Sequence, residues 1–398
     1  MNTTNNINKL ITYLFIIGLS LSLIFVYFAQ ERLYREITYG ILSLGTEKYV
    51  RSFSVMFIFI VVILNLFDVK KKYLPKLFIA YLLILGYITI NYLLTGPGID
   101  DLGGLMHTKG IGPWLAFGLI FVSFDDYRYN LFKKFLIISV LFISGYVIYN
   151  LIENGIGLYR GQALAKYRVY ATNLVWVSPF VFLILKNNKK LRVLRVYAIF
   201  IGIFSALVTL TRSFLLIYLL VLVFDFFHTG KKTTYVIGGF VIGLIFTYIL
   251  LNTESFSTSF ELLQQRGTND TRFNQLAEFL SQVNFFDVIV GKGYDSTWYF
   301  RGHPYAYLDN QWLLLIWWAG LIPAVLYFYL TAAIPFKLFF KKNQDYETRV
   351  ESFVLVIWTL ACAGLSIYTT MSVDFFFFII CVIQGRLLYK YSQRDEYR

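Results

Sequence analysis

A succession of apolar runs constrains this sequence more than any other feature, because most of them are long enough to cross a lipid bilayer as a helix. Crossing ~30 Å of hydrocarbon takes about 17–25 residues of α-helix. Hydrophobic residues make up 58% of the 398 residues and charged residues only 15%, so one water-soluble core cannot hide the apolar side chains. The sequence therefore predicts an all-α, polytopic transmembrane helical bundle.

About twelve spans are expected, and together they form a single integral membrane domain over residues 1–398. The first span is longer than the apolar core of a signal peptide and lacks a small-x-small cleavage site, so we interpret it as uncleaved. The seventh and eighth are joined so closely at Thr211-Arg212-Ser213 that they form a hairpin or one broken helix. The predicted spans are residues 10–29, 52–67, 77–95, 105–124, 135–152, 173–185, 196–211, 213–228, 234–251, 310–334, 352–370 and 373–389.

Basic residues gather on one side of the predicted bundle, for example in the runs at 70–72, 133–134 and 341–342. Because short cytoplasmic loops carry an excess of Lys and Arg, this pattern places both termini and every lysine-rich loop in the cytoplasm. The net charge of +13 is then explained by topology and by contact with membrane lipid headgroups. Nucleic acid is not expected as a partner.

Only one predicted outer loop is large, residues 252–309, which precedes the last three spans. Apolar residues recur there at helical spacing, at Phe273, Leu276, Leu280 and Val283, with Asp270 or Thr271 as the N-cap. This pattern predicts an amphipathic helix. The helix either lies on the outer surface of the membrane or packs over the spans.

The arginines on the outer side require an explanation, because the positive-inside rule disfavours basic residues there. Arg212 stands between two apolar runs, where a cation is costly unless it is paired or faces a polar cavity. The planar guanidinium fork suits phosphate oxygens, so these arginines form a candidate clamp for a pyrophosphate. The candidate binding residues are Arg212, Arg272, Arg168, Arg160 and Arg301.

Two titratable residues near the end of the large loop are candidate general bases. A carboxylate at a partly desolvated boundary has its pKa raised towards that of a base, which describes Asp309 at the start of the tenth span. His303 is the other candidate, since imidazole titrates near neutral pH. The alternatives are an N-cap role for Asp309 and an ordinary loop position for His303.

Neither a cofactor nor a metal ion is expected. The outer loops hold no acidic pair with metal-ligand spacing. Cys362 and Cys381 lie inside apolar runs, where a thiol behaves as a small hydrophobic group.

The motifs around the candidate arginines and bases resemble those of the O-antigen ligase and polymerase superfamily (Wzy/WaaL type) of bacterial surface polysaccharide assembly. Its members carry a Thr/Ser-Arg-Ser/Gly segment opening a span, matched by Thr211-Arg212-Ser213. They also carry a large outer loop with an Arg, a later Gly-x-Gly turn and a polar pair. Arg272, Gly291-Lys292-Gly293 and Asp309-Asn310 match these features.

The ligase branch has His before the polar residue and a small residue after the glycine. Here Asn310 and Gly320 keep the spacing, with nine residues between them, but Asp309 replaces the His and Pro323 replaces the small residue. This departure favours a polymerase of repeat units over a lipid A ligase.

The resemblance implies metal-independent, GT-C-like glycosyl transfer at the outer face of the bacterial cytoplasmic membrane. An undecaprenyl-pyrophosphate-linked oligosaccharide is the implied donor and a lipid-linked repeat unit the implied acceptor. A chain-length regulator and a flippase are the implied protein partners. Two alternatives stay open: a polysaccharide flippase or transporter, and a ligase-like enzyme that uses another acceptor.

Overall fold

The computed structural model describes residues 2–39, 46–68, 75–98, 100–107, 109–154, 162–208, 212–228, 271–305, 308, 310–364 and 374–395. Within these ranges the chain is all-α apart from one two-stranded antiparallel hairpin, which confirms the all-α part of the predicted fold class. The chain divides into two compact units. The first is Met1–Phe25, Thr46–Lys134 and Thr271–Arg398, and the second is Val26–Gly45 and Phe135–Asp270.

Two helices, α1 (Asn2–Tyr39) and α6 (Asp126–Asn154), pass from one unit into the other. The other elements of the first unit are α2 (Thr46–Asp68), α3 (Pro75–Thr95), α4 (Leu102–Leu105), α5 (Gly112–Phe117), the 3₁₀ helix η1 (Gly118–Phe124), α12 (Thr271–Gln282), α13 (Phe285–Val290), β1 (Trp298–Phe300), β2 (His303–Tyr305), α14 (Gln311–Ala319), α15 (Leu321–Phe328), the π-helix η3 (Tyr329–Ala333), α16 (Ile334–Phe340), α17 (Tyr346–Gly364) and α18 (Phe375–Asp395). The second unit also contains α7 (Gln162–Ile184), the 3₁₀ helix η2 (Lys189–Leu191), α8 (Arg192–Val208) and α9 (Arg212–Phe227).

Several helices have the length and composition of membrane spans, as expected for a multi-pass membrane protein. Six such helices occur in the described ranges: Asn6–Phe28, Tyr49–Leu66, Leu77–Thr95, Asp126–Tyr149, Leu321–Phe340 and Phe375–Gln393. Three shorter apolar helices accompany them: Gly112–Phe124, Thr172–Ile184 and Ser213–Phe227. The predicted ninth span, 234–251, lies outside the described residues, so the total of about twelve stays a prediction.

The predicted tenth span, 310–334, is wrong as one continuous helix. Gly320 adopts φ +89°, a conformation that L side chains rarely adopt, and it separates α14 from α15. The candidate span therefore runs over Leu321–Phe340, and α14 is a separate helix before it. The side chain of Asn310 caps α14 by accepting a hydrogen bond from the Leu313 amide at 3.1 Å.

The predicted fourth span, 105–124, is shorter than expected and begins at Gly112. Since a 3₁₀ helix rises about 2.0 Å per residue and an α-helix 1.5 Å, α5 and η1 together extend about 23 Å. They pack against α2 and α18. A side chain at Gly118 would collide with Val62, and one at Gly385 with the backbone of Ile120. Glycine thus allows α2 and α18 to enclose this short segment.

The second unit is built around the close packing of α7, α8 and α9. The hydroxyl groups of Ser178 and Tyr218 are hydrogen-bonded at 2.8 Å. Gly202 of α8 lies directly against both, because a Cβ there would be 2.2 Å from the Tyr218 oxygen and 2.5 Å from the Ser178 oxygen. A glycine in α8 therefore allows the polar contact between α7 and α9.

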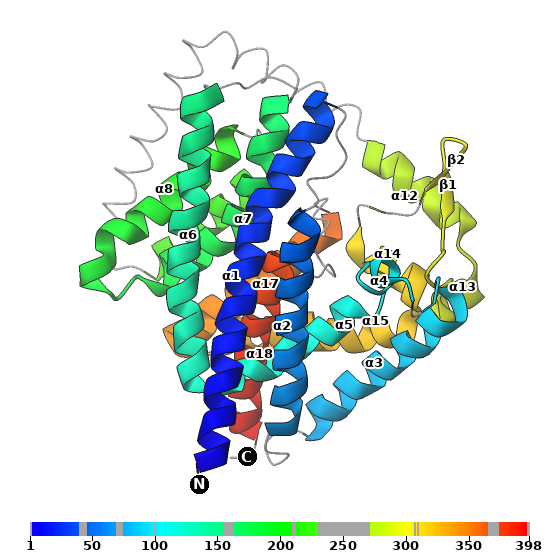
Figure 1. Cartoon of the computed structure of the whole chain (residues 1–398), viewed down its shortest axis with the longest axis horizontal. Helices are drawn as coiled ribbons and strands as arrows, with labels where there is room; N and C mark the ends of the chain where they lie inside the picture. The colour runs from blue at the N-terminus through cyan, green and yellow to red at the C-terminus, as the bar shows by residue number, and fades with distance from the viewer. Residues whose placement is uncertain are drawn as a thin grey trace. The chain divides into compact units, whose positions relative to one another are not determined.

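The described part of the large loop lies at one edge of the first unit. In Figure 1, α12, α13 and the β1–β2 hairpin gather beside the C-terminal end of α3. This edge holds the candidate residues of the loop.

Candidate functional site

A small aromatic core organises the described part of the large loop. Phe279 of α12 lies 5.4 Å from Trp298 of β1 and 5.2 Å from Trp317 of α14, measured between ring centroids, and Leu308 completes the buried cluster. The apolar face of α12 therefore packs on the hairpin and on α14, and the choice between the membrane surface and packing over the spans stays a prediction. Leu280, expected on its apolar face, is exposed.

The β1–β2 hairpin carries two of the candidate residues at its exposed end. Strand pairing sets Phe300 opposite His303, with Arg301 and Gly302 in the turn at φ 52° and 79°. Positive φ at both turn positions matches the right-handed twist of a hairpin. The side chains of Arg301 and His303 are both exposed.

Side chains of α12 hold this hairpin in place. The Arg301 amide donates to the Glu278 carboxylate at 3.0 Å. The Gln282 side chain accepts from the Tyr299 amide at 2.8 Å and donates to the Tyr299 carbonyl at 2.7 Å. These contacts fix the backbone of the hairpin, so α12 determines the direction in which the hairpin points.

The glycines of the Gly291-Lys292-Gly293 turn meet the break at Gly320. The amides of Lys292 and Gly293 donate to the carbonyls of Trp317 and Trp318 at 2.8 and 2.9 Å. These carbonyls end α14 and have no partner within the helix, so the turn satisfies them. A Cβ at Gly291 would lie 2.6 Å from the backbone of Gly320. We call this contact between residues 291–293 and 317–320 the glycine joint.

Beyond the joint, the loop docks on the end of α3 and on the segment before α5. The Tyr294 amide donates to the Thr95 hydroxyl at 2.9 Å. The Lys109 amino group donates to the backbone carbonyl of Ser296 at 2.6 Å and to its hydroxyl at 2.9 Å. Sequence reasoning missed Lys109, which lay inside a predicted span, and a charged residue there was the signal that marked it.

Burial changes the titration of two groups at this contact. It lowers the pKa of Lys109 to about 8, and the nearby Asp295 carboxylate opposes that shift. The pKa of His107 is also lowered, first by burial and then by the charges of Lys109 and Arg51. The Lys109 amide donates to Nδ1 of His107 at 3.3 Å, so the neutral ring carries its proton on Nε2.

The predicted phosphate-binding arginines are divided between the two units, and their grouping into a clamp stays a prediction. Arg168 and Arg212 belong to the second unit, in α7 and at the start of α9, whereas Arg272 and Arg301 belong to the first. The side chains of the helical residues Arg168, Arg212 and Arg272 lie outside the described part of the structure. Arg160 and the candidate base Asp309 lie outside it entirely.

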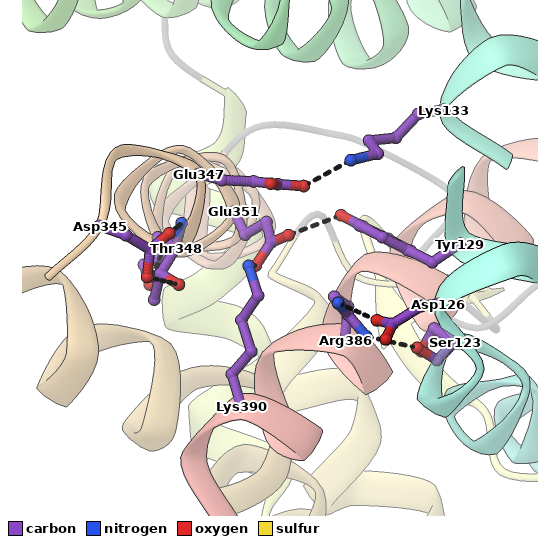
Figure 2. Close-up of polar contacts among 11 residues, drawn as sticks. Ser123, Asp126, Tyr129, Lys133, Asp345, Glu347, Thr348, Glu351, Arg386 and Lys390 are labelled. Atoms are coloured by element: carbon purple, nitrogen blue, oxygen red, sulfur yellow. Dashed lines mark hydrogen bonds and ion pairs between the residues drawn. The ribbon is translucent and has the colours of Figure 1, made fainter. Parts of the chain in front are cut away.

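A second polar cluster joins α6, α17 and α18 within the first unit (Figure 2). Glu351 is fully buried, and its carboxylate accepts from the Tyr129 hydroxyl at 2.8 Å and from the Lys390 amine at 2.9 Å. Lys133 pairs with Glu347 one turn away at 2.7 Å. Every carboxylate oxygen of Glu351 thus has a donor, as a buried carboxylate requires.

Arg386 extends the same cluster towards α5–η1. Its guanidinium forms an ion pair with Asp126 and lies 5.1 Å from the Tyr129 ring centroid. The cluster joins the N-terminal ends of α6 and α17 to the C-terminal part of α18. The charge pattern of the sequence predicts that these ends lie on the cytoplasmic side. Sequence reasoning treated these charges only as topology signals.

The second unit has its own buried carboxylate. Asp225 of α9 is fully buried and pairs with Arg195 of α8 and with Lys186, whose amine lies 3.4 Å from it. The Asp225 carboxylate is neutralised here as Glu351 is in its cluster, but by two basic groups in place of one. Both arrangements suit a structural role, in which buried ion pairs hold neighbouring helices together.

The loop edge is the better candidate for chemistry, because it exposes a guanidinium and an imidazole two residues apart on a fixed hairpin. A guanidinium can bind anionic oxygen and an imidazole can accept a proton. Within the described residues no group of three or more His, Cys, Asp or Glu side chains gathers as a metal site would require. Comparison with protein-family models, with curated proteins and with solved structures found no match to this chain.

Proposed function

We propose that this chain polymerises lipid-linked oligosaccharide repeat units at the outer face of the bacterial cytoplasmic membrane. The proposal starts from the resemblance of its motifs to O-antigen ligases and polymerases. The observation that carries it is the glycine joint. Gly291, Gly293 and Gly320 belong to two separate motifs of that resemblance. The backbone of Gly291 lies against that of Gly320, and the Gly293 amide donates to the carbonyl of Trp318.

The joint gives these motif residues a common physical purpose. It fixes the large loop to the start of a candidate span, and Asn310 caps the helix between them. The hairpin that carries Arg301 and His303 is attached to the same loop core through Trp298 and Trp317. A loop fixed in this way holds catalytic groups at the membrane boundary, where a lipid-linked sugar presents its reactive end.

In the proposed reaction, a sugar hydroxyl of the acceptor attacks the anomeric carbon of the donor glycan. The new glycosidic C–O bond forms while the bond between that carbon and the pyrophosphate oxygen breaks. The polyprenyl pyrophosphate leaves with the bonding electrons, and a base takes the hydroxyl proton. Asp309 is the proposed base, with His303 as the competing candidate.

Arginines stabilise the charge that develops on the departing pyrophosphate. Arg212, Arg272, Arg168, Arg160 and Arg301 are the proposed source of these donors. Because the transition state gathers negative charge on the leaving group, fixed guanidinium groups lower the barrier more than they strengthen binding of the donor.

Deletion of the gene tests the proposal against the transporter and ligase alternatives. If the chain is the polymerase, its deletion leaves single lipid-linked repeat units at the outer face. A gel of surface polysaccharide then shows no ladder of longer chains. A flippase predicts units confined to the inner face. A ligase predicts full-length polymer that stays on its lipid carrier. Either of the last two patterns contradicts the proposal.

A further inference from the structure

The short helix α13 presents large apolar side chains outward. Phe285 is 81% exposed and Phe286 70%, and Ile289 and Val290 are also exposed. The neighbouring α12 instead buries Phe279 in the core of the loop. Two adjacent, fully presented phenylalanines are unfavourable in water, so their surroundings need an explanation.

Contacts to α3 give the position of α13 along a candidate span. The Tyr87 hydroxyl donates to the Val290 carbonyl at 2.8 Å. Tyr87 lies just over two turns before Thr95, the end of the span Leu77–Thr95, or about 12 Å along the helix axis. From there the chain advances to Thr95, which accepts from the Tyr294 amide. The C-terminal end of α13 therefore lies beside the last part of the span and not beyond its end.

The exposed side of α13 adjoins helices whose exposed sides are equally apolar. α13 packs against α15, and α15 packs against α3. Both α3 and α15 belong to candidate spans, whose exposed apolar side chains have lipid as their solvent. These side chains are Leu83, Ile90 and Leu94 on α3 and Leu321, Ile322 and Val325 on α15.

We propose that α13 inserts into the membrane leaflet on the side of the large loop, with the acyl chains of bilayer lipid as its partner. The polar groups of α13 fit this placement. Asp287 is largely buried and pairs with Lys292 at 3.4 Å, and Asn284 caps the helix through the Asp287 amide. The apolar side chains are left for lipid. Insertion sets the depth of the glycine joint, which begins at the residue after α13. This inference depends on membrane embedding and not on the proposed reaction.

Nitroxide accessibility in proteoliposomes tests the insertion. In the full-length chain with Cys362→Ala and Cys381→Ala, a spin label is placed at Phe286→Cys and, as the matched control, at Asn274→Cys on the exposed face of α12. The label at 286 is expected to collide with dissolved oxygen more often than with a water-soluble nickel chelate. The label at 274 is expected to show the reverse order.

Two results would overturn the proposal. Nickel access at 286 equal to that at 274 means that α13 is in water. Low access to both reagents at 286 means that protein covers it, and a rise in oxygen access on dilution with lipid then identifies a second copy of the chain. If Phe286→Cys does not insert, Phe285→Cys and Ile289→Cys on the same helix provide the measurement.

Discussion

Lys109 binds both acceptors that Ser296 offers, the backbone carbonyl oxygen at 2.6 Å and the hydroxyl oxygen at 2.9 Å. The side chain of Lys109 is almost fully buried. One amino group thus ties the large loop to the segment before α5. Its protonation is the clearest source of pH dependence in the described part of the loop.

Lys109 predicts a stability change in alkaline solution. Its pKa is lowered to about 8 in the folded protein from 10.5, so below pH 8 the folded state carries the whole cost of a buried ammonium. Between these values the unfolded chain binds more protons, and stability rises with pH by at most about 1.4 kcal/mol per unit. Between pH 7 and 9.5, the stability of the wild type measured by thermal unfolding should rise with pH relative to that of Lys109→Met. A constant difference between the two proteins would contradict this assignment.

Gly291→Ala should weaken the glycine joint. The new Cβ would lie 2.6 Å from the backbone of Ala319 and Gly320 in addition to the strain of φ +84°. Gly302→Ala is the matched control, since it has φ +79° with open space around it and should cost only the backbone strain of about 1–2 kcal/mol. Limited proteolysis of the loop should be faster in Gly291→Ala than in the control. Equal rates would show that the joint does not hold the loop.

Lys390→Met should destabilise the protein by about 3–5 kcal/mol, because it leaves the buried Glu351 carboxylate without its cation. Replacing both residues, as Lys390→Met with Glu351→Leu, should recover part of that loss. Lys133→Met provides the control, since its partner Glu347 is exposed and the pair is worth about 0–1 kcal/mol. Thermal unfolding in detergent measures all three. Equal losses of stability in Lys390→Met and Lys133→Met would contradict a structural role for the buried ion pair.

Arg212→Ala should abolish polymer while the protein still inserts, because the lost contacts act on the leaving group. Arg212→Lys should restore only part of the activity, since an ammonium lacks the bidentate fork. Gels of surface polysaccharide and membrane immunoblots give the two measurements. Full-length polymer from Arg212→Ala at normal expression would remove this residue from the proposed clamp.

Asparagine at position 309 keeps the size and polarity of the side chain but loses the basic oxygen. Because Asn310 forms the cap of α14, Asp309→Asn tests catalysis without removing that cap. Single lipid-linked repeat units should accumulate without a ladder, whereas His303→Ala should keep most of it. The opposite pattern, with normal polymer from Asp309→Asn and none from His303→Ala, would transfer the base to His303.

Sequence periodicity predicted the long apolar helices because burial in lipid leaves a continuous local signal. The spans at 10–29, 52–67 and 77–95 each lie within a helix of the structure. The break at Gly320 was missed because a glycine inside an apolar run changes hydropathy little. Its positive φ accompanies a close approach to Gly291, which no local pattern records.

Contacts between distant segments were equally invisible in the sequence. The positions of Lys109 and Ser296 depend on how α3, α4 and α5 meet the loop, and hydropathy gives no information on this. The candidate arginines were chosen for sidedness and chemistry. Arg212 and Arg301 belong to different units, so no local sequence pattern could have grouped them.

The division of the chain bears on how the protein is made. The first unit combines both ends of the sequence, with Tyr129 and Glu351 separated by 222 residues and Lys109 and Ser296 by 187. When only the first two hundred residues have left the ribosome, Tyr129 and Lys109 are without these partners. Because buried polar groups without partners are costly, we expect the first unit to complete its packing only after Ser296 and Glu351 have been synthesised. Truncation near the C-terminus should therefore mark the whole protein for degradation by membrane quality control.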